Sequence, residues 1–430
     1  MSIIGAMYSG ISGLGSNATM MEIIGNNLAN INTPAFKFSR ADFSDVLAKT
    51  LAGGMEIGRG SRVGDTSMVM AQGGFQSTEN VTDIALSGKG FFMVRDDATN
   101  SMLYTRNGSF MVDKNGYVTN SAGMKLMGFS LNENSTASGV PHDIRVTQAP
   151  LAPKVTTEVS LYANLDSQAE IVGPFDITNP VNTSNFTASI TVYDTLGNPH
   201  QVTSYFSRNA APGAGGGNVW EYNIVVDAAD SATGADYVAT SGTIEFSTEG
   251  ALLDQVITQP PDFDFAGNPL QNQDISFEFG TPISAGGTGT DGTTQFGEGS
   301  ALVFASQDGY GTSYIDSLNI DSDGKVIALY GNGETREIAQ IAIVNFSNAI
   351  GLDHRGNNMF GSTSESGEPI ISIANVSGNG SIFSNTLELS NVDIAQQFVE
   401  MITTQRGFQA NSKSITTADT MIAELINISR

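Results

Sequence analysis

The sequence predicts a mainly β chain with paired terminal α-helices, arranged as nested domains. Three observations carry this prediction: apolar residues at heptad spacing near both ends, alternating apolar and polar residues in the middle, and glycine-containing turns between the alternating segments. The chain has 430 residues, which allows two or three domains. Its 48 glycines and only 15% charged residues are typical of short strands joined by many turns.

The N-terminal segment is predicted to form a helix that ends near Asn30. Its apolar residues follow alternating steps of three and four, the stripe of a coiled coil. Pro34 disfavours helix in the residue before it, so a turn is expected there. Glycines within this segment weaken the helix by about 1 kcal/mol each relative to Ala, so it needs a partner. The predicted core residues are Ile4, Met7, Ile11, Leu14, Met21 and Leu28.

The C-terminal segment mirrors the first and is predicted to be helical over about 390–428. Ser390 and Asp393 resemble a helix N-cap pair, with the Asp near the positive end of the helix dipole. Two matching heptad helices at opposite ends of a β-rich chain indicate that the ends meet. The predicted core residues are Ile394, Phe398, Met401, Phe408, Ile415 and Ile422.

The middle of the chain is predicted to be β structure. Residues 186–193 alternate apolar and polar side chains, residues 194–199 form a turn, and 202–206 and 220–226 are further strands. The 113–116 and 321–324 segments contain Asn-Gly and Asp-Gly and predict hairpin turns, whereas 213–217 and 280–300 read as loops. The predicted domains are a terminal helical core (1–32 and 390–430), a linker and intersubunit region (33–80), an inner β domain (81–152 and 304–389) and an inserted outer β domain (153–303).

Composition excludes several classes of function. The formal net charge of -25 argues against binding to nucleic acid or to an anionic membrane surface. The absence of Cys excludes disulfides and thiolate catalysis. No run of about 18 apolar residues predicts a transmembrane helix, and the N-terminus lacks the pattern of a cleaved secretory signal. His142, His200 and His354 lack metal-ligand spacing, and no nucleophile and base can be assembled. We therefore predict no metal, no cofactor and no enzymatic activity.

Residues 25–37 resemble the signature of the flagellar rod and hook family. Ala35 stands where that family commonly has Gly, so the tight turn there is expected to differ slightly. Blocks at 86–94 and 104–116, and a third at 392–411, resemble the same family. The length and the segments 190–200 and 309–333 resemble its hook members rather than its shorter rod members. The motif residues are Asn26, Asn27, Ala29, Asn30, Thr33, Phe36, Lys37, Gln405 and Arg406.

This resemblance implies a structural subunit that assembles helically into a short curved tube, a flexible joint that transmits torque from rod to filament. It implies an extracellular location in the flagellar hook and export by the flagellar type III apparatus without a cleaved signal peptide. The implied partners are copies of the same chain, the distal rod protein, the hook cap and the hook–filament junction proteins. It also implies that region 33–80 is stabilised largely by neighbouring subunits.

The sequence leaves two alternatives open. Another flagellar axial protein, such as a distal rod or hook-associated junction protein, would share the terminal helices but not the pattern around 194–200. A secreted β-rich adhesin would be a monomer and would have no need for paired termini.

Overall fold

The computed structural model describes residues 3–46, 49–50, 56–57, 60–132, 136–146, 149–208, 218–268 and 270–428. The chain divides into two compact units. Unit 1 comprises Met1–Gln148, Asp316–Leu329 and Thr335–Arg430, and unit 2 comprises Ala149–Ile315 and Tyr330–Glu334. The predicted mainly β fold with paired terminal helices is confirmed. The predicted loop 213–217 lies outside the described residues, and the four-part domain division stays a prediction.

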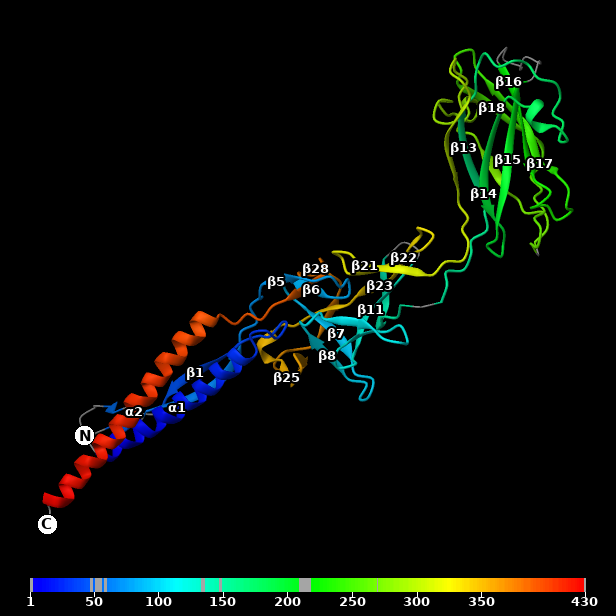
Figure 1. Cartoon of the computed structure of the whole chain (residues 1–430). Coiled ribbons are helices and arrows are strands. Elements are labelled where there is room, and N and C mark those ends of the chain that lie inside the picture. Colours follow the sequence, from blue (N-terminus) through cyan, green and yellow to red (C-terminus); the bar gives the residue numbers. More distant parts are fainter. Residues whose placement is uncertain are drawn as a thin grey trace. The chain divides into compact units, whose positions relative to one another are not determined.

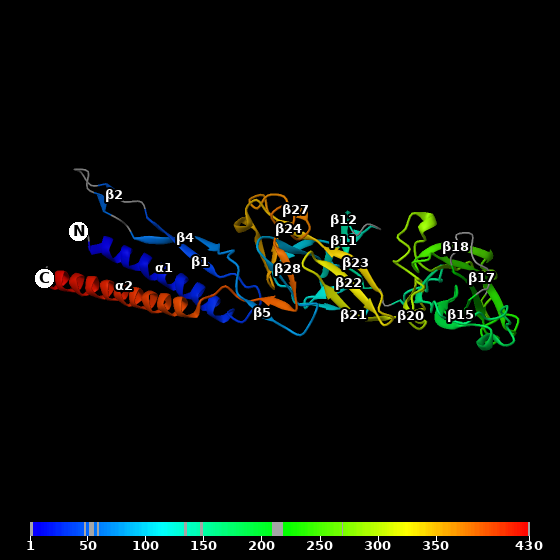
Figure 2. The same ribbon diagram turned by 90° about the horizontal axis from the view of Figure 1, so that it is seen from above.

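Unit 1 holds the two α-helices of the described chain, α1 (Ile3–Ala29) and α2 (Ile394–Ile428). They lie side by side in both views (Figures 1 and 2). The second helix begins at residue 394 rather than near 390, because the Asp393 carboxylate accepts a hydrogen bond from the Gln396 N–H at 3.1 Å and caps the helix. Neither helix is long and apolar enough to cross a membrane.

A two-stranded antiparallel sheet, which the sequence did not predict, runs beside α1. It consists of β1 (Ser39–Asp45) and β4 (Ser61–Met68), with a bulge between Asp42 and Phe43. The Ser16 hydroxyl of α1 donates to the Ser61 carbonyl at 3.2 Å. Region 33–80 therefore has contacts within its own chain, in addition to any that neighbouring subunits supply. The short strands β2 (Lys49–Thr50) and β3 (Glu56–Ile57) also pair with each other.

The rest of unit 1 is a large sheet with small two-stranded additions. Its central path is β21-β22-β23-β11-β7-β8-β26-β25, and β5 and β6 pair with β29 and β28 outside it. Beneath it lies an aromatic cluster in which the Tyr104 and Phe346 rings meet edge to face, 4.8 Å apart. The strands are β5 (Phe75–Ser77), β6 (Ile84–Ser87), β7 (Phe91–Arg95), β8 (Met102–Thr105), β9 (Phe110–Val112), β10 (Val118–Asn120), β11 (Lys125–Leu131), β12 (Ala137–Asp143), β21 (Ile315–Ile320), β22 (Lys325–Tyr330), β23 (Thr335–Ile341), β24 (Ile343–Asn345), β25 (Asp353–Gly356), β26 (Met359–Gly361), β27 (Ile370–Ser372), β28 (Ser381–Ser384) and β29 (Thr386–Glu388).

Both predicted hairpin turns of unit 1 are present. Gly116 and Gly324 have positive φ angles of 84° and 79°, a conformation that glycine adopts without a steric penalty. Each N–H bonds back to the carbonyl three residues earlier, at Asp113 and Asp321. The two turns thus use the same local chemistry in two distant segments.

Unit 2 is a sandwich of a five-stranded and a three-stranded sheet, with strand orders β14-β15-β16-β17-β18 and β19-β13-β20. Trp220, Tyr222, Phe206 and Phe279 lie in the core between them, each no more than 1% exposed. This core explains the alternation in the sequence, because every second side chain of a strand points toward the facing sheet. The strands are β13 (Glu158–Asn164), β14 (Phe186–Tyr193), β15 (Pro199–Arg208), β16 (Asn218–Val226), β17 (Tyr237–Phe246), β18 (Leu252–Gln259), β19 (Ser276–Glu278) and β20 (Ala301–Gln307).

Asp308 joins the end of β20 to the segment before β13. Its carboxylate accepts hydrogen bonds from the Thr157 and Glu158 N–H groups at 2.8 and 3.0 Å, and Lys154 Nζ lies 3.0 Å away. Burial alone would raise the pKa of Asp308, but these hydrogen bonds outweigh burial and hold the pKa well below its usual range.

We predict that Asp308→Asn makes unit 2 less stable at pH 7, and that the difference from the parent chain shrinks as the pH falls. A depressed folded-state pKa stabilises the fold above the unfolded carboxyl pKa of about 3.9, and this stabilisation is lost as the pH falls toward the folded value. The difference in unfolding free energy is measured by urea unfolding at pH 7 and pH 3. The signal is the fluorescence of Trp220, the single Trp of the chain. Equal differences at both pH values would contradict this assignment.

Candidate functional site

The helix pair packs through glycines. A Cβ atom on Gly10 would lie 2.9 Å from Ile415 Cγ1, and one on Gly407 would lie 2.9 Å from Asn17 Oδ1. These pairings run in opposite directions along the two helices, so α1 and α2 are antiparallel. Glycines that weaken each isolated helix therefore allow the two backbones to approach closely.

The buried seam of α2 is shifted from the predicted heptad. The buried residues are Gln397, Thr404 and Ala418, spaced seven or fourteen apart, and they are polar or small. Of the six predicted core residues, Met401, Ile415 and Ile422 are half-buried beside this seam. Ile394, Phe398 and Phe408 are 49%, 48% and 43% exposed in the single chain. The apolar stripe thus lies partly on the seam and partly on an open face.

The first helix shows the same division. Met7, Leu14, Met21 and Leu28 are half-buried, whereas Ile11 is 54% exposed. The side chain of Ile4 lies outside the described residues. The sequence missed Ile24, which is fully buried, because the predicted stripe counted only one face and α1 also has β1 and β4 against it.

Asn27 joins three elements at the base of the helix pair. Its amide donates to the Gln397 side chain of α2 at 3.0 Å and exchanges two hydrogen bonds of 2.9 Å with the backbone of Ser39 in β1. Asn27 is 1% exposed, so all these partners are needed to satisfy a buried amide. This geometry gives the second Asn of the motif a structural role.

The other motif residues form the turn after α1. The Asn30 amide donates to the Asn26 carbonyl at 2.9 Å, and the Thr33 hydroxyl donates to Asn30 Oδ1 at 3.1 Å. Ala35 is buried with a positive φ of 57°, so the chain keeps the left-handed turn at a steric cost that Gly would avoid. Ala29 is exposed.

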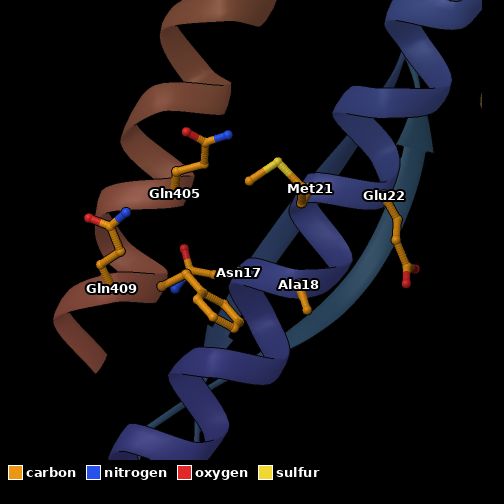
Figure 3. Close-up of a pocket in the computed structure, with 7 residues that line it drawn as sticks. Asn17, Ala18, Met21, Glu22, Gln405 and Gln409 are labelled. Atoms are coloured by element: carbon orange, nitrogen blue, oxygen red, sulfur yellow. The ribbon is translucent and has the colours of Figure 1, made fainter. Parts of the chain in front are cut away.

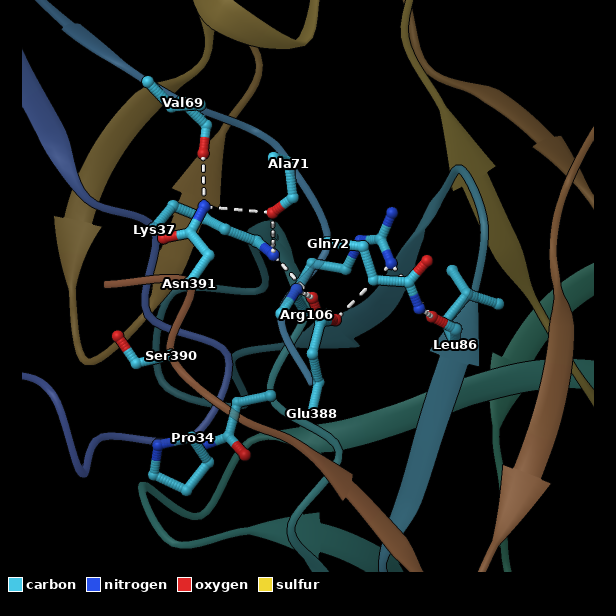
Figure 4. Close-up of polar contacts among 12 residues, drawn as sticks. Pro34, Lys37, Val69, Ala71, Gln72, Leu86, Arg106, Glu388, Ser390 and Asn391 are labelled. Carbon is cyan, nitrogen blue, oxygen red and sulfur yellow. Dashed lines mark hydrogen bonds and ion pairs between the residues drawn. The ribbon is translucent and has the colours of Figure 1, made fainter. Parts of the chain in front are cut away.

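Beyond this turn lies a buried cluster of charges, which we call the charge junction: Lys37, Glu388 and Arg106 (Figure 4). Lys37 Nζ lies 2.5 Å from Glu388 Oε1, and Arg106 Nη1 lies 3.5 Å from Glu388 Oε2. The three side chains are 2%, 0% and 8% exposed. They come from three distant segments of the chain, and only Lys37 was predicted as a site residue.

Backbone groups complete the charge junction. Lys37 also donates to the Ala71 carbonyl at 2.8 Å, the Gly73 N–H donates to Glu388 Oε1 at 2.9 Å, and Arg106 donates to the Leu86 carbonyl at 3.1 Å. Burial lowers the pKa of Lys37, although the Glu388 carboxylate raises it, and burial also lowers the pKa of Arg106. Two cations thus share one carboxylate away from water, so the cluster depends on Glu388.

Two backbone contacts hold the crossing segments together around this cluster. The Ala35 N–H donates to the Glu388 carbonyl at 2.8 Å, and the Asn391 N–H donates to the Phe36 carbonyl at 3.2 Å. The Asn391 side chain donates to the Val69 carbonyl at 2.8 Å. The residues that follow α1 and those that precede α2 are therefore joined to each other and to the β structure of unit 1.

An open groove of about 530 Å³ lies between the two helices (Figure 3). Met21 and Phe408 supply apolar walls, and Asn17, Gln405 and Gln409 supply amides. Gln405 belongs to the C-terminal motif, whose next residue, Arg406, is exposed. The groove and the exposed stripe together form an apolar and amide-rich surface, with no arrangement for catalysis among these residues.

Four parts of the chain match families of flagellar rod and hook proteins. Residues 7–37 match the family described as flagella basal body rod protein, 85–189 the flagellar hook protein FlgE/F/G D1 domain, 164–310 the flagellar basal body protein FlaE D2 domain, and 384–428 the flagellar basal body rod FlgEFG protein C-terminal.

Full-length relatives agree with these matches. The chain is 31% identical to the flagellar hook protein FlgE of Borreliella burgdorferi, over 98% of this chain and 99% of the relative. It is 32% identical to that of Treponema pallidum (99% and 99%) and 31% identical to that of Escherichia coli (98% and 100%). The crystal structure of Helicobacter pylori flagellar hook protein FlgE2 resembles it with a TM-score of 0.50 at 14% identity, covering 71% of this chain and 98% of that one, which is a likeness of fold alone.

We predict that Glu388→Gln destabilises unit 1 by about 3–5 kcal/mol, because it leaves two buried cations without a counter-charge. Lys37→Met should cost less, about 1–3 kcal/mol, since Glu388 keeps its pairing with Arg106. Urea unfolding followed by far-UV circular dichroism measures both, and the fluorescence of Trp220 in unit 2 serves as the internal control. A larger loss for Lys37→Met would show that Glu388 is not the centre of the charge junction.

Proposed function

The chain belongs to the flagellar hook protein family and is a structural subunit of the flagellar hook, not an enzyme; from this premise we propose how its own surfaces perform that role. Copies of the chain assemble helically into a short, curved, flexible tube that transmits torque from rod to filament. The full-length matches to hook proteins favour this role over a distal rod protein, a junction protein or an adhesin.

The exposed apolar residues of the helix pair carry this proposal. Ile11, Phe398, Ile402 and Phe408 are between 43% and 54% exposed on helices that already have each other as partners. Burying such side chains stabilises an association by about 25 cal/mol per Å² of apolar surface. A second copy that covers this face would therefore stabilise the assembly, with the groove beside Met21 and Gln405 as part of the contact.

The geometry of the assembly depends on which faces of the identical copies contact each other. A face that packs against a different face of the next copy generates an open helical filament when the rotation between copies does not close into a ring. In this arrangement the paired helices form the inner wall of the tube, and the β structure lies outside it. The distal rod protein, the hook cap and the junction proteins would meet the ends of the tube.

We also propose that the chain reaches the hook through the flagellar type III export apparatus in a largely unfolded state. The chain contains no Cys, so no disulfide can hold it folded before export. The marginal, glycine-containing first helix supports the same route, because it gains stability mainly from its partners.

We predict that Ile11→Asp abolishes tube formation while both units stay folded. Ile11 is 54% exposed, so an Asp there is solvated in the monomer but would be buried without a partner in the assembly. Ile415→Asp should also block assembly. Because Ile415 lies against Gly10, however, this substitution would disturb the helix pair itself. Sedimentation and electron microscopy under polymerising conditions, with circular dichroism of the monomer, make the measurement.

Val256→Asp is the matched control. Val256 is 52% exposed in β18 of unit 2, outside the helix pair, so the same apolar-to-acidic change there should leave tube formation intact. Tubes of normal length from Ile11→Asp would overturn the proposed role of the helix face.

A further inference from the structure

Two edge strands lie together on one side of the unit 2 sandwich. β14 is the first strand of the five-stranded sheet, β20 is the last strand of the three-stranded sheet, and the two contact each other. Each pairs along only one edge within the described part of the chain: β14 with β15, and β20 with β13. We call the surface made by β14 and β20 the neutral side of unit 2.

The neutral side has fewer charged residues than the rest of unit 2. Residues 149–315 contain nineteen Asp and Glu side chains but only two basic ones, Lys154 and Arg208. Each of the other described strands of the sandwich carries a charged residue, whereas β14 and β20 carry none. The two strands that make this side of a strongly acidic unit are therefore themselves uncharged.

The neutral side also exposes large apolar groups. Leu302, Val303 and Phe304 of β20 are 43%, 71% and 48% exposed. The Phe304 ring lies 5.4 Å from the ring of Tyr162 in β13, which extends the apolar surface onto the next strand. Soluble proteins usually protect an edge strand with charges or proline, and β20 has neither.

We propose that the neutral side is where unit 2 of one copy packs against a second copy of this chain. This inference rests on the proposed function, which supplies the copies. Two surfaces that both carry a large negative charge repel each other, so close approach of like copies costs least where that charge is absent. Apolar side chains at that place give the approach a favourable contact.

The contact is made by side chains rather than by an added strand. β20 is irregular opposite Tyr162 and Ala163, where Val303 is the extra residue of a bulge. A bulge bends the strand and interrupts the row of backbone groups that a partner strand would need. It also makes Val303 the most exposed apolar residue of β20, and so the residue that a second copy would cover.

The absence of Cys in the chain makes a direct test possible. Val303→Cys and Val256→Cys each place one thiol in the full-length chain, on the neutral side and on the acidic β18 edge. We expect both thiols to react quickly with a maleimide in the monomer. In preassembled tubes the thiol at 303 should react at least about tenfold more slowly, whereas the thiol at 256 should change little.

Two results would overturn the inference: equal reactivity at 303 in tubes and monomers, or slow reactivity at 303 already in the monomer, which would mean that the chain covers its own β20. Hydrogen exchange of the β20 amides in the unsubstituted chain gives the same comparison without any substitution. Failure of the unsubstituted chain to form tubes would count against the proposed function instead, so the two failures are distinguishable.

Discussion

The burial of Lys37, Glu388 and Arg106 is the constraint on which unit 1 depends. A carboxylate with no access to water must keep its cations, so the segment after α1, the segment before α2 and the β structure that holds Arg106 come together in one arrangement. Replacing such a cluster by apolar residues can leave a protein equally stable. We infer that its contribution here is to favour one arrangement of the helix pair on the β structure.

The helix pair is built so that its apolar groups are only partly used within one chain. Glycines, Asn27 and Gln397 occupy the seam and allow close approach and satisfied amides, while several of the largest apolar side chains face outward. A pair with all its apolar residues inside would be more stable alone but would offer little to a neighbour. The division between a polar seam and an apolar outer face suits a protein that completes its core in the assembly.

Charge divides unit 2 in a similar way. The many acidic side chains oppose contact between copies, and the uncharged strands β14 and β20 leave one side on which this repulsion is weaker. Under the proposed contact, a small neutral surface among repelling charges would hold copies of unit 2 together only weakly, and weak contacts are compatible with a tube that bends.

The sequence by itself determined the two helices, the alternating strands, the Asn-Gly and Asp-Gly turns and the family, because heptad spacing, alternation and motifs are local patterns. Tertiary structure alone decided which side of each helix is buried. The apolar stripe marked Ile394, Phe398 and Phe408, but Gln397 and Thr404 are the buried residues. The Gln397 amide is buried because it accepts a hydrogen bond from Asn27 of α1, a contact that the spacing of apolar residues does not encode. Tertiary structure also decided that Lys37 pairs with Glu388, 351 positions away, since buried charge pairing depends on proximity in space and leaves no periodic signal along the chain.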